Sequence, residues 1–488
     1  MNGSIIRYIL GTIIRFMGIF LLFPVIVAFI YKEDVWIYYL IVALVCQLIG
    51  FINSRYKPKD NVFYLKEGCV ATGLSWIILS IIGALPVCLS KEIPSYVDAL
   101  FEIISGFTTT GASILSDVEA LSHATIFWRS FTHLVGGMGV LVFLLAVIPL
   151  SGGSNMNLMR AESPGPSVGK LMPKVSGTAR VLYLIYLGMT FIEFVLLLIG
   201  GTPVFTAINT AMATAGTGGF GMYNDSLTSF TMYEQWVVTI FMVLFGINFN
   251  AYYLILFGRI KDALKMEELR AYLGILVAST LIIFLNILKG CNGIADALTQ
   301  AAFQVASISS STGFSTADFA QWPQTSRTIL VLLMFTGACA GSTGGGIKVS
   351  RFVMLMKNVR KELSTYIHPR RITRLTMDGK EIGRDVLHST NVYFGTFIIL
   401  FAISVFCLSF ENLDFATNVT AVAATMNNIG PGMSMVGPTC NFSFYSNFSK
   451  LVLMFDMLAG RLELYPILML FHPKIWQSAY ISIKKQHS

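Results

Sequence analysis

The chain has 488 residues, of which 55% are hydrophobic and only 12% are charged, and its formal net charge is +8. Because a soluble domain usually carries about 25% charged residues, this composition excludes an ordinary soluble protein and indicates a helical protein with many membrane spans. Basic residues collect in the cytoplasmic loops of membrane proteins, so the positive charge gives no reason to expect a nucleic-acid partner.

Apolar stretches of about 20 residues, the length that crosses a bilayer, recur along the whole chain. The first is longer than the hydrophobic region of a secretory signal peptide and contains Arg15, so we expect a retained helix. The predicted spans are 5–30, 35–53, 70–90, 127–150, 181–200, 236–257, 271–289, 329–347, 390–410 and 451–471.

Four shorter apolar segments lie between these spans, at 97–106, 203–213, 294–306 and 415–426. At roughly 10–13 residues each, they are too short to cross a bilayer and suit re-entrant half-helices. Each leads into a tetrad of small or polar residues that ends in glycine. The tetrads are Thr108–Gly111, Ala215–Gly218, Ser310–Gly313 and Asn427–Gly430.

The tetrad glycines are 107, 95 and 117 residues apart, a recurrence that predicts a four-fold repeat of span, half-helix, glycine loop and span. The predicted divisions are two leading helices in 1–60 and pore units in 61–160, 161–265, 266–370 and 371–488. The predicted fold is an all-α membrane protein with four pseudo-symmetric units around one pore.

Glycine suits a backbone that turns its carbonyl groups toward a shared axis, and four such loops could replace the hydration shell of a cation. The alternative is that the small residues only let helices pack closely, which four recurrences behind half-helices disfavour. The predicted selectivity filter comprises Thr109, Thr110, Gly111, Gly216, Thr217, Gly218, Ser311, Thr312, Gly313, Asn428, Ile429 and Gly430.

Loop charges predict the orientation. The segments 152–180 and 348–374 are strongly basic and should be cytoplasmic. The tetrads open toward the opposite, acidic loops, so the filter should face outward and the acids should concentrate cations. These acids are Asp117, Glu119, Asp225, Glu234, Asp318, Glu411 and Asp414.

Two sequence features occur in only one of the four predicted units each: a glycine-rich stretch in the third and an arginine within a span in the fourth. A glycine-rich stretch at 337–346 must break the helix of an otherwise apolar span, which is tolerated beside a water-filled pore; the alternative is a hinge or a tight helix crossing. Arg461 lies in the middle of a span without an acid on its own helix face. It must meet an acid elsewhere, backbone carbonyls or pore water.

Other ionisable residues in apolar surroundings carry weaker signals. We expect Glu102, Glu193, Asp296 and Asp456 to satisfy loop amides or helix ends rather than bind ions. His123 and His133 are interpreted as packing or interfacial residues. We expect neither an enzyme nor a receptor, because the sequence contains no nucleophile–base set and no soluble catalytic domain.

The motifs resemble the Trk/Ktr/HKT superfamily of potassium transporters, in which one chain joins four helix–pore loop–helix units. The stretches Gly337–Arg351, Asn427–Gly432 and Gly460–Glu463 are similar to the bacterial Trk membrane subunit, as are the two additional N-terminal helices. Ile429, in the place of a threonine, and Gly216, inside the second tetrad, depart from the pattern.

The resemblance implies channel-like potassium uptake across the bacterial inner membrane by a multi-pass protein; a proton- or sodium-coupled symporter is the alternative. It implies potassium as substrate at the filter carbonyls, no cofactor, a homodimer, contact with membrane lipid, and a cytosolic ring of nucleotide-binding, TrkA-like regulatory subunits. It also implies a flexible gate below the filter and an arginine barrier in the pore. The implied gating residues are Gly337, Ala338, Gly341, Ser342, Thr343, Gly344, Gly345, Gly346, Lys348 and Arg461.

Overall fold

The computed structural model describes residues 2–55, 64–139, 175–370 and 374–476. Six helical segments within them are long and apolar enough to cross a membrane, or seven if a bent pair forms one span. The six contain α1 (Gly3–Phe20) with α2 (Leu22–Tyr31), α3 (Trp36–Ser54), α4 (Leu65–Leu89), α9 (Val175–Ile199), α14 (Glu267–Ile287) and α18 (Arg384–Leu408).

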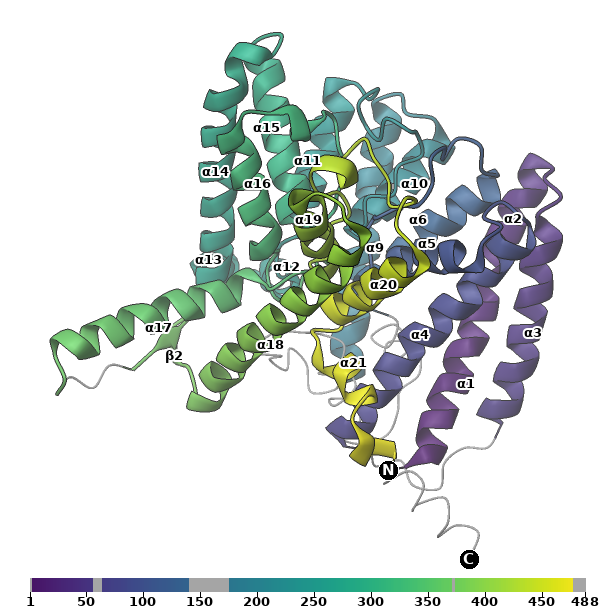
Figure 1. Cartoon of the computed structure of the whole chain (residues 1–488), viewed down its shortest axis with the longest axis horizontal. Coiled ribbons are helices and arrows are strands. Elements are labelled where there is room, and N and C mark those ends of the chain that lie inside the picture. The colour runs from purple at the N-terminus through teal and green to yellow at the C-terminus, as the bar shows by residue number, and fades with distance from the viewer. Residues whose placement is uncertain (1, 56–63, 140–174, 371–373, 477–488) are drawn as a thin grey trace, which may run out of the picture.

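The helices α1 and α3 form a closely packed leading pair (Figure 1). Glycines allow the close approach: a Cβ atom at Gly18 would lie 2.8 Å from the Ala43 carbonyl oxygen, and one at Gly50 would lie 2.8 Å from that of Gly11. Small residues permit such packing in membranes. The pair then contacts α4.

Four groups of three helices follow, each with a long helix, a half-helix and a second helix. The half-helices are α5 (Tyr96–Phe107), α10 (Val204–Ala215), α15 (Ile294–Ser309) and α19 (Phe415–Met426). The second helices are α6 (His123–Met138), α11 (Met232–Phe245), α16 (Gln324–Thr336) and α20 (Asn447–Arg461). All four predicted half-helices are present within three residues of the expected bounds.

Each second helix packs against the half-helix of the next group, in the pairs α6 with α10, α11 with α15, α16 with α19 and α20 with α5. The last pair joins the end of the chain to its first repeat, where Lys450 Nζ lies 2.6 Å from Asp98 Oδ1. The four groups therefore close into a ring around one axis.

The second helices α11, α16 and α20 are interrupted, and the sequence predicted only one of these interruptions. The helix α11 ends at Phe245, and α12 (Phe249–Leu256) continues at a 92° bend. The helix α16 ends before Gly337, which has φ 64°, and α20 is followed by a break and α21 (Tyr465–Leu470). The predicted spans 236–257 and 451–471 are wrong in this respect, whereas the span 329–347 is broken where its glycine-rich stretch begins, as predicted. The end of 127–150 lies outside the described residues.

The remaining described elements lie outside the four groups of three helices. The helix α13 (Ile260–Lys265) precedes α14, and α17 (Val349–Ile367) projects from the body (Figure 1). Strands β1 (Thr376–Met377) and β2 (Lys380–Glu381) form an antiparallel hairpin that pairs Thr376 with Glu381. Four short 3-10 helices are η1 (Leu288–Gly290), η2 (Phe319–Gln321), η3 (Ser409–Glu411) and η4 (Ser434–Val436).

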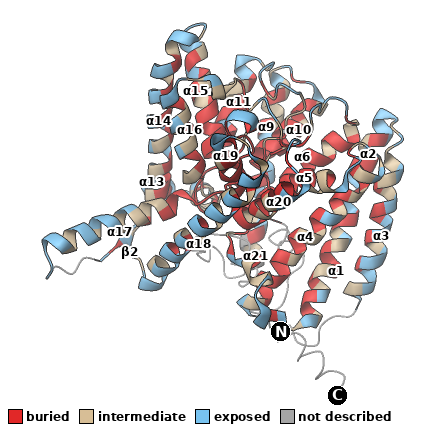
Figure 2. Cartoon of the chain, in the orientation of Figure 1, coloured by how far each residue is buried: buried red, intermediate tan, exposed pale blue. Residues whose placement is uncertain are grey.

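Burial separates the centre of the molecule from its surface (Figure 2). The half-helices are mostly buried, and they place polar side chains such as Thr108 and Asn427 in the interior. The outer helices expose apolar side chains, for example Leu48 on α3 and Leu285 on α14, at 63% and 68%. An apolar exterior around a polar centre is the arrangement of a multi-pass membrane protein.

Candidate ion-conduction pathway

The half-helices lead into four loops with one shared backbone conformation. In each, a left-handed residue comes two positions after the helix ends, and a left-handed glycine follows two positions later. The first set, with φ of 52–59°, is Thr109, Thr217, Ser311 and Asn428. The glycines, with φ of 72–96°, are Gly111, Gly219, Gly313 and Gly430. We call residues 108–111, 216–219, 310–313 and 427–430 the four glycine loops.

The shared conformation corrects the predicted alignment of the second loop. The sequence pattern paired Gly218 with Gly111, whereas the left-handed glycine in that place is Gly219. With glycines at 216, 218 and 219, the sequence permits several alignments, and only the backbone angles distinguish them. Gly218 still belongs to the loop, in the place that Thr110 occupies in the first loop.

Each left-handed glycine faces a carbonyl oxygen of the next loop, so a Cβ atom there would collide with the oxygen or crowd it. The facing pairs are Gly111 with Gly218, Gly219 with Thr312, Gly313 with Ile429 and Gly430 with Thr110. Glycine is therefore required both for its positive φ and for the close approach. The contacts pass from loop to loop and return to the first, which makes the four loops a closed ring.

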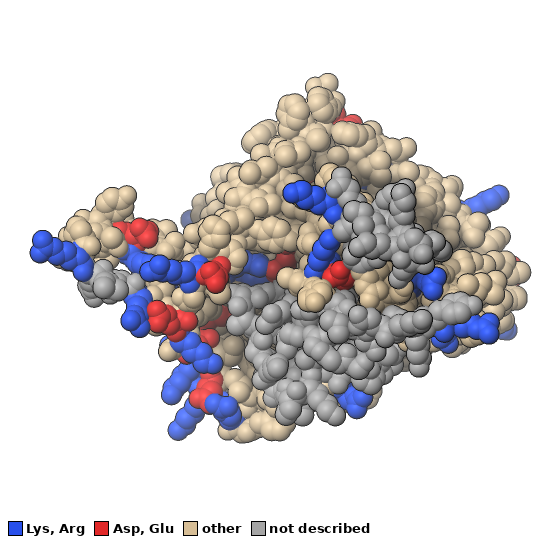
Figure 3. Space-filling model, turned by 90° about the horizontal axis from the view of Figure 1, so that it is seen from below, with Lys and Arg blue, Asp and Glu red and all other residues tan. Residues whose placement is uncertain are grey.

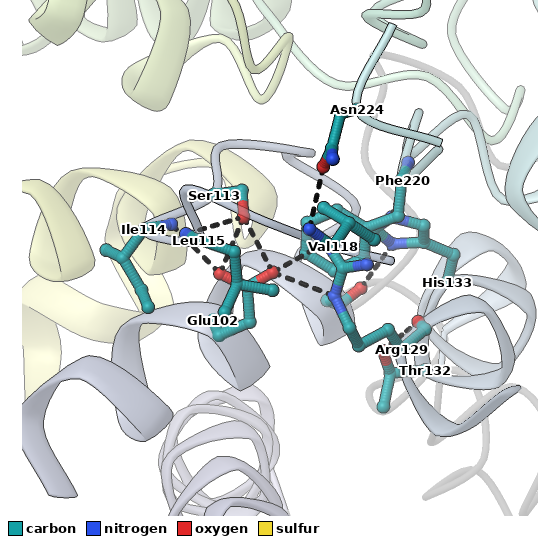
Figure 4. A network of polar contacts seen from close by, with 11 residues as sticks. Glu102, Ser113, Ile114, Leu115, Val118, Arg129, Thr132, His133, Phe220 and Asn224 are labelled. Carbon is teal, nitrogen blue, oxygen red and sulfur yellow. Dashed lines mark hydrogen bonds and ion pairs between the residues drawn. The ribbon is translucent and has the colours of Figure 1, made fainter. Parts of the chain in front are cut away.

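The ring borders a cavity of about 140 Å³ that is lined by all four left-handed glycines. Asn224, also on its wall, accepts a hydrogen bond from the Val118 amide (2.8 Å, Figure 4) and donates one to Asp117 Oδ1 (2.9 Å). The Asn224 hydrogen bond holds the pKa of the Asp117 carboxyl below its usual value. A fixed negative charge beside the cavity attracts cations.

Side chains support the glycine loops unequally. The hydroxyls of Thr108 and Thr110 are 2.8 Å apart in the first loop, and those of Ser310 and Thr312 are 2.7 Å apart in the third. The fourth loop is tied to the first by Asn428 Nδ2, which donates to Thr110 Oγ1 at 3.0 Å. The second loop has glycine at both hydroxyl positions. The ring is four-fold in backbone but not in side-chain support.

The segment between α16 and α17, residues 337–348, lies against the ring. The Gly345 amide donates to Ser311 Oγ at 2.6 Å. A Cβ atom at Gly344 would lie 2.8 Å from the Ser310 carbonyl oxygen, and one at Gly345 would lie 2.7 Å from that of Asn427. Both oxygens stand where a half-helix ends and its glycine loop begins, so the 337–348 loop covers that end of two of the four loops.

Buried charges hold the 337–348 loop in place. Glu268 Oε1, on α14, accepts hydrogen bonds from the amides of Ala340 (2.6 Å) and Ser350 (3.1 Å). The ammonium group of Lys348 is buried and donates to the carbonyl oxygen of Gly344, within the loop. The loop is therefore fixed at both ends and across its middle.

Arg461 joins the 337–348 loop to the first unit. Its guanidinium donates to the carbonyl oxygens of Thr343 (2.7 Å), Gly136 (2.5 Å) and Gly137 (2.7 Å). The sequence predicted an acid, backbone carbonyls or pore water as the partner of Arg461, and the structure shows backbone carbonyls. Because α6 ends at Met138, both glycine carbonyls lie in its last turn, where carbonyl groups can accept bonds from outside the helix. The Gly136 carbonyl also accepts the capping bond from the Gly139 amide at 3.1 Å.

Four further acids were expected to accept hydrogen bonds from loop amides or helix ends, and two of them do. Glu102 and Asp296 accept hydrogen bonds from loop amides, as expected. Asp456 instead accepts one from the Ser404 hydroxyl at 2.7 Å. Glu193 meets neither a loop amide nor a cation among the described residues, and its polar neighbour is the Thr214 hydroxyl.

A closed ring of four carbonyl-bearing loops within a helical membrane protein defines a membrane cation transport protein rather than an enzyme. The model of the TrkH family, described as a cation transport protein, matches residues 41–482. The chain therefore belongs to the TrkH family.

Similar proteins match almost the whole chain. The Trk system potassium uptake protein TrkH of Salmonella typhimurium is 32% identical over 490 residues, covering 98% of this chain and all of that protein. The Trk system potassium uptake protein TrkG of Escherichia coli is 31% identical over 490 residues, which also cover 98% of this chain and all of that protein. The crystal structure of the potassium transporter TrkH from Vibrio parahaemolyticus matches with a TM-score of 0.87 at 30% identity, covering 98% of this chain and all of that one.

Proposed function

We propose that the chain takes up potassium across the bacterial inner membrane, with the four glycine loops as a channel-like selectivity filter. The observation that carries the proposal is the closed ring, in which each glycine abuts a carbonyl of the next loop. Carbonyl oxygens at fixed spacing can replace the water around a dehydrated cation. The potassium uptake named for the relatives supports this choice of ion.

The proposed gate is the 337–348 loop together with Arg461. The loop touches the ends of two glycine loops, and the guanidinium bridges the loop to α6. A positive charge on the path of a cation raises the barrier to its passage. The closed state would thus combine an obstacle with a repelling charge.

We expect Arg461→Ala to raise potassium flux in liposomes by about tenfold, since each 1.36 kcal/mol removed from a barrier is worth a factor of ten in rate. Arg461→Lys, which retains the charge, should stay much closer to the parent chain. Flux through the folded alanine variant that equals or falls below that of the parent would favour a purely structural arginine.

The orientation is proposed from charge. The arm α17 carries Lys357, Arg360 and Lys361, and the molecule seen from below shows Lys and Arg side chains, with Asp and Glu among them, along this projection (Figure 3). Basic segments remain on the cytoplasmic side. The glycine loops would then open outward, and α17 would be available to a TrkA-like ring of regulatory subunits beneath a homodimer embedded in lipid.

Coupled symport is a second candidate, favoured by one observation. Glu193 lies on the membrane-spanning helix α9, is fully buried, and has no ion-pair partner among the described residues, its polar neighbour being the Thr214 hydroxyl. An isolated charge there is costly, so a protonated Glu193 could carry a coupling proton.

Reversal potentials in liposomes test both functions. A potassium channel should follow the potassium gradient by about 59 mV per tenfold change, with little response to opposing sodium or pH gradients. A reversal potential that shifts with the proton or sodium gradient at constant potassium would establish coupled transport. No cation current in reconstituted, folded protein would contradict both.

A further inference from the structure

The second glycine loop lacks the hydroxyl pair of the first and third loops, because glycine occupies positions 216, 218 and 219. Its one side-chain bond of its own among the described residues is local, from Thr217 Oγ1 to the Gly216 carbonyl oxygen at 2.6 Å. Its other support comes from the neighbouring unit, on the helix α6. His133, which is fully buried on that helix, contacts the loop directly. A Cβ atom at Gly218 would lie 2.3 Å from both Cγ and Nδ1 of the imidazole, so only glycine lets the loop backbone come this close to the ring.

Both ring nitrogens of His133 are engaged, and their partners determine the tautomer. His133 Nδ1 lies 2.7 Å from the Gly106 carbonyl oxygen, which can only accept a hydrogen bond. The Phe220 amide, which can only donate, lies 3.3 Å from His133 Nε2. The proton must therefore be on Nδ1, and the neutral imidazole bridges the half-helix α5 to the residue that follows Gly219 (Figure 4).

The bridge belongs to a rigid network. The imidazole and the Phe220 ring are 4.3 Å apart between centroids, and the Arg129 guanidinium lies 4.1 Å from the centroid of the same phenyl ring. Arg129 is fixed by a buried ion pair with Glu102 at 2.7 Å. Glu102 in turn accepts a hydrogen bond from the Ile114 amide, just beyond the first glycine loop (Figure 4).

We infer that His133 is a positioning residue for ion selectivity, which sets the place of the second-loop carbonyls relative to the first loop through its bond to the Phe220 amide. The inference rests on the proposed potassium filter and adds a determinant outside the four loops. A ring of carbonyls discriminates between cations only while its members keep their spacing, and this loop depends on His133 for that.

Two amide variants separate the two bonds of the imidazole. In His133→Asn the amide nitrogen takes the place of Nδ1 and can still donate to Gly106, but the side chain is too short to reach Phe220. In His133→Gln the terminal oxygen can take the place of Nε2 and accept from the Phe220 amide. The measurement is the potassium-to-sodium permeability ratio, from reversal potentials in liposomes.

We expect His133→Asn to lower the ratio about fivefold, the scale of one lost buried hydrogen bond, and His133→Gln to stay within about twofold of the parent chain. His123→Asn is the matched control, since His123 lies on the same helix but is paired with Glu33 at 2.9 Å, away from the glycine loops. It should leave the ratio unchanged. Should the asparagine variant not fold, His133→Leu takes its place with the same expected loss.

An unchanged ratio in the folded asparagine or leucine variant would overturn the inference. So would equal losses in the glutamine and asparagine variants, which would mean that the imidazole acts by its shape alone. A parent chain without potassium selectivity would instead count against the proposed function, so the two failures are distinguishable.

Discussion

Deletion of residues 338–345 is expected to raise potassium flux at least about tenfold, the largest effect on transport rate that the structure predicts. The deleted residues include Gly344 and Gly345, which lie against the Ser310 and Asn427 carbonyls, and Thr343, whose carbonyl accepts from Arg461. The deletion would remove both the loop that covers the ring and one hydrogen-bond partner of the Arg461 guanidinium. Potassium flux into liposomes is the measurement.

A milder change in the same loop provides the control. In Gly345→Ala the new Cβ would lie 2.7 Å from both the Asn427 oxygen and the Asn428 Cβ, which should push the loop away from the ring without shortening it. We expect a smaller increase in the same direction. If the deletion variant remains folded and conducts no faster than the parent chain, the loop is not the gate.

Gly111→Ser is expected to lower the potassium-to-sodium permeability ratio about tenfold, equivalent to about 1.4 kcal/mol of lost discrimination. The serine Cβ would collide with the Gly218 carbonyl oxygen, and either the first or the second loop must move. A displaced carbonyl ring fits potassium less well and distinguishes it less from sodium. The ratio is measured from reversal potentials under opposing gradients.

The matched control is Gly258→Ser. Gly258 has φ 76°, close to the 78° of Gly111, but no atom lies within 4 Å of its added Cβ. The two variants therefore suffer similar backbone strain and differ in the steric collision. If both leave the ratio as it is, the first loop does not determine selectivity; if both lower it equally, strain rather than the ring explains the loss.

The length of the short apolar segments, each followed by a glycine tetrad, was enough to predict the half-helices. At roughly 10–13 residues these segments suit half-helices, and α19 has the predicted bounds, Phe415–Met426. The same signal failed to show where α11 and α20 end, because hydropathy hardly changes at a break whose backbone groups are satisfied by other segments. The turn at Glu463 and Leu464, both with positive φ, has no glycine to reveal it.

Tertiary contacts account for what the sequence could not predict at the site. His133 was interpreted as a packing or interfacial residue, and nothing near it in sequence indicates the Phe220 amide, 87 residues away. The carbonyl partners of Arg461 come from the loop at Thr343 and from the end of α6. A chemical motif can identify that a charge is buried, but only the fold supplies its partners.

The contact between the first and last units, which closes the ring, has a consequence for biosynthesis. The α5–α20 contact, the Asn428 bond to Thr110 and the Lys450–Asp98 pair join residues more than 300 positions apart. A nascent chain that has inserted three units therefore has three of the four loops and an open side, with Asp98 and Thr110 still lacking these partners. Ion discrimination would arise only when the final unit docks, so a chain truncated before α18 would be a substrate for membrane quality control rather than a weaker transporter.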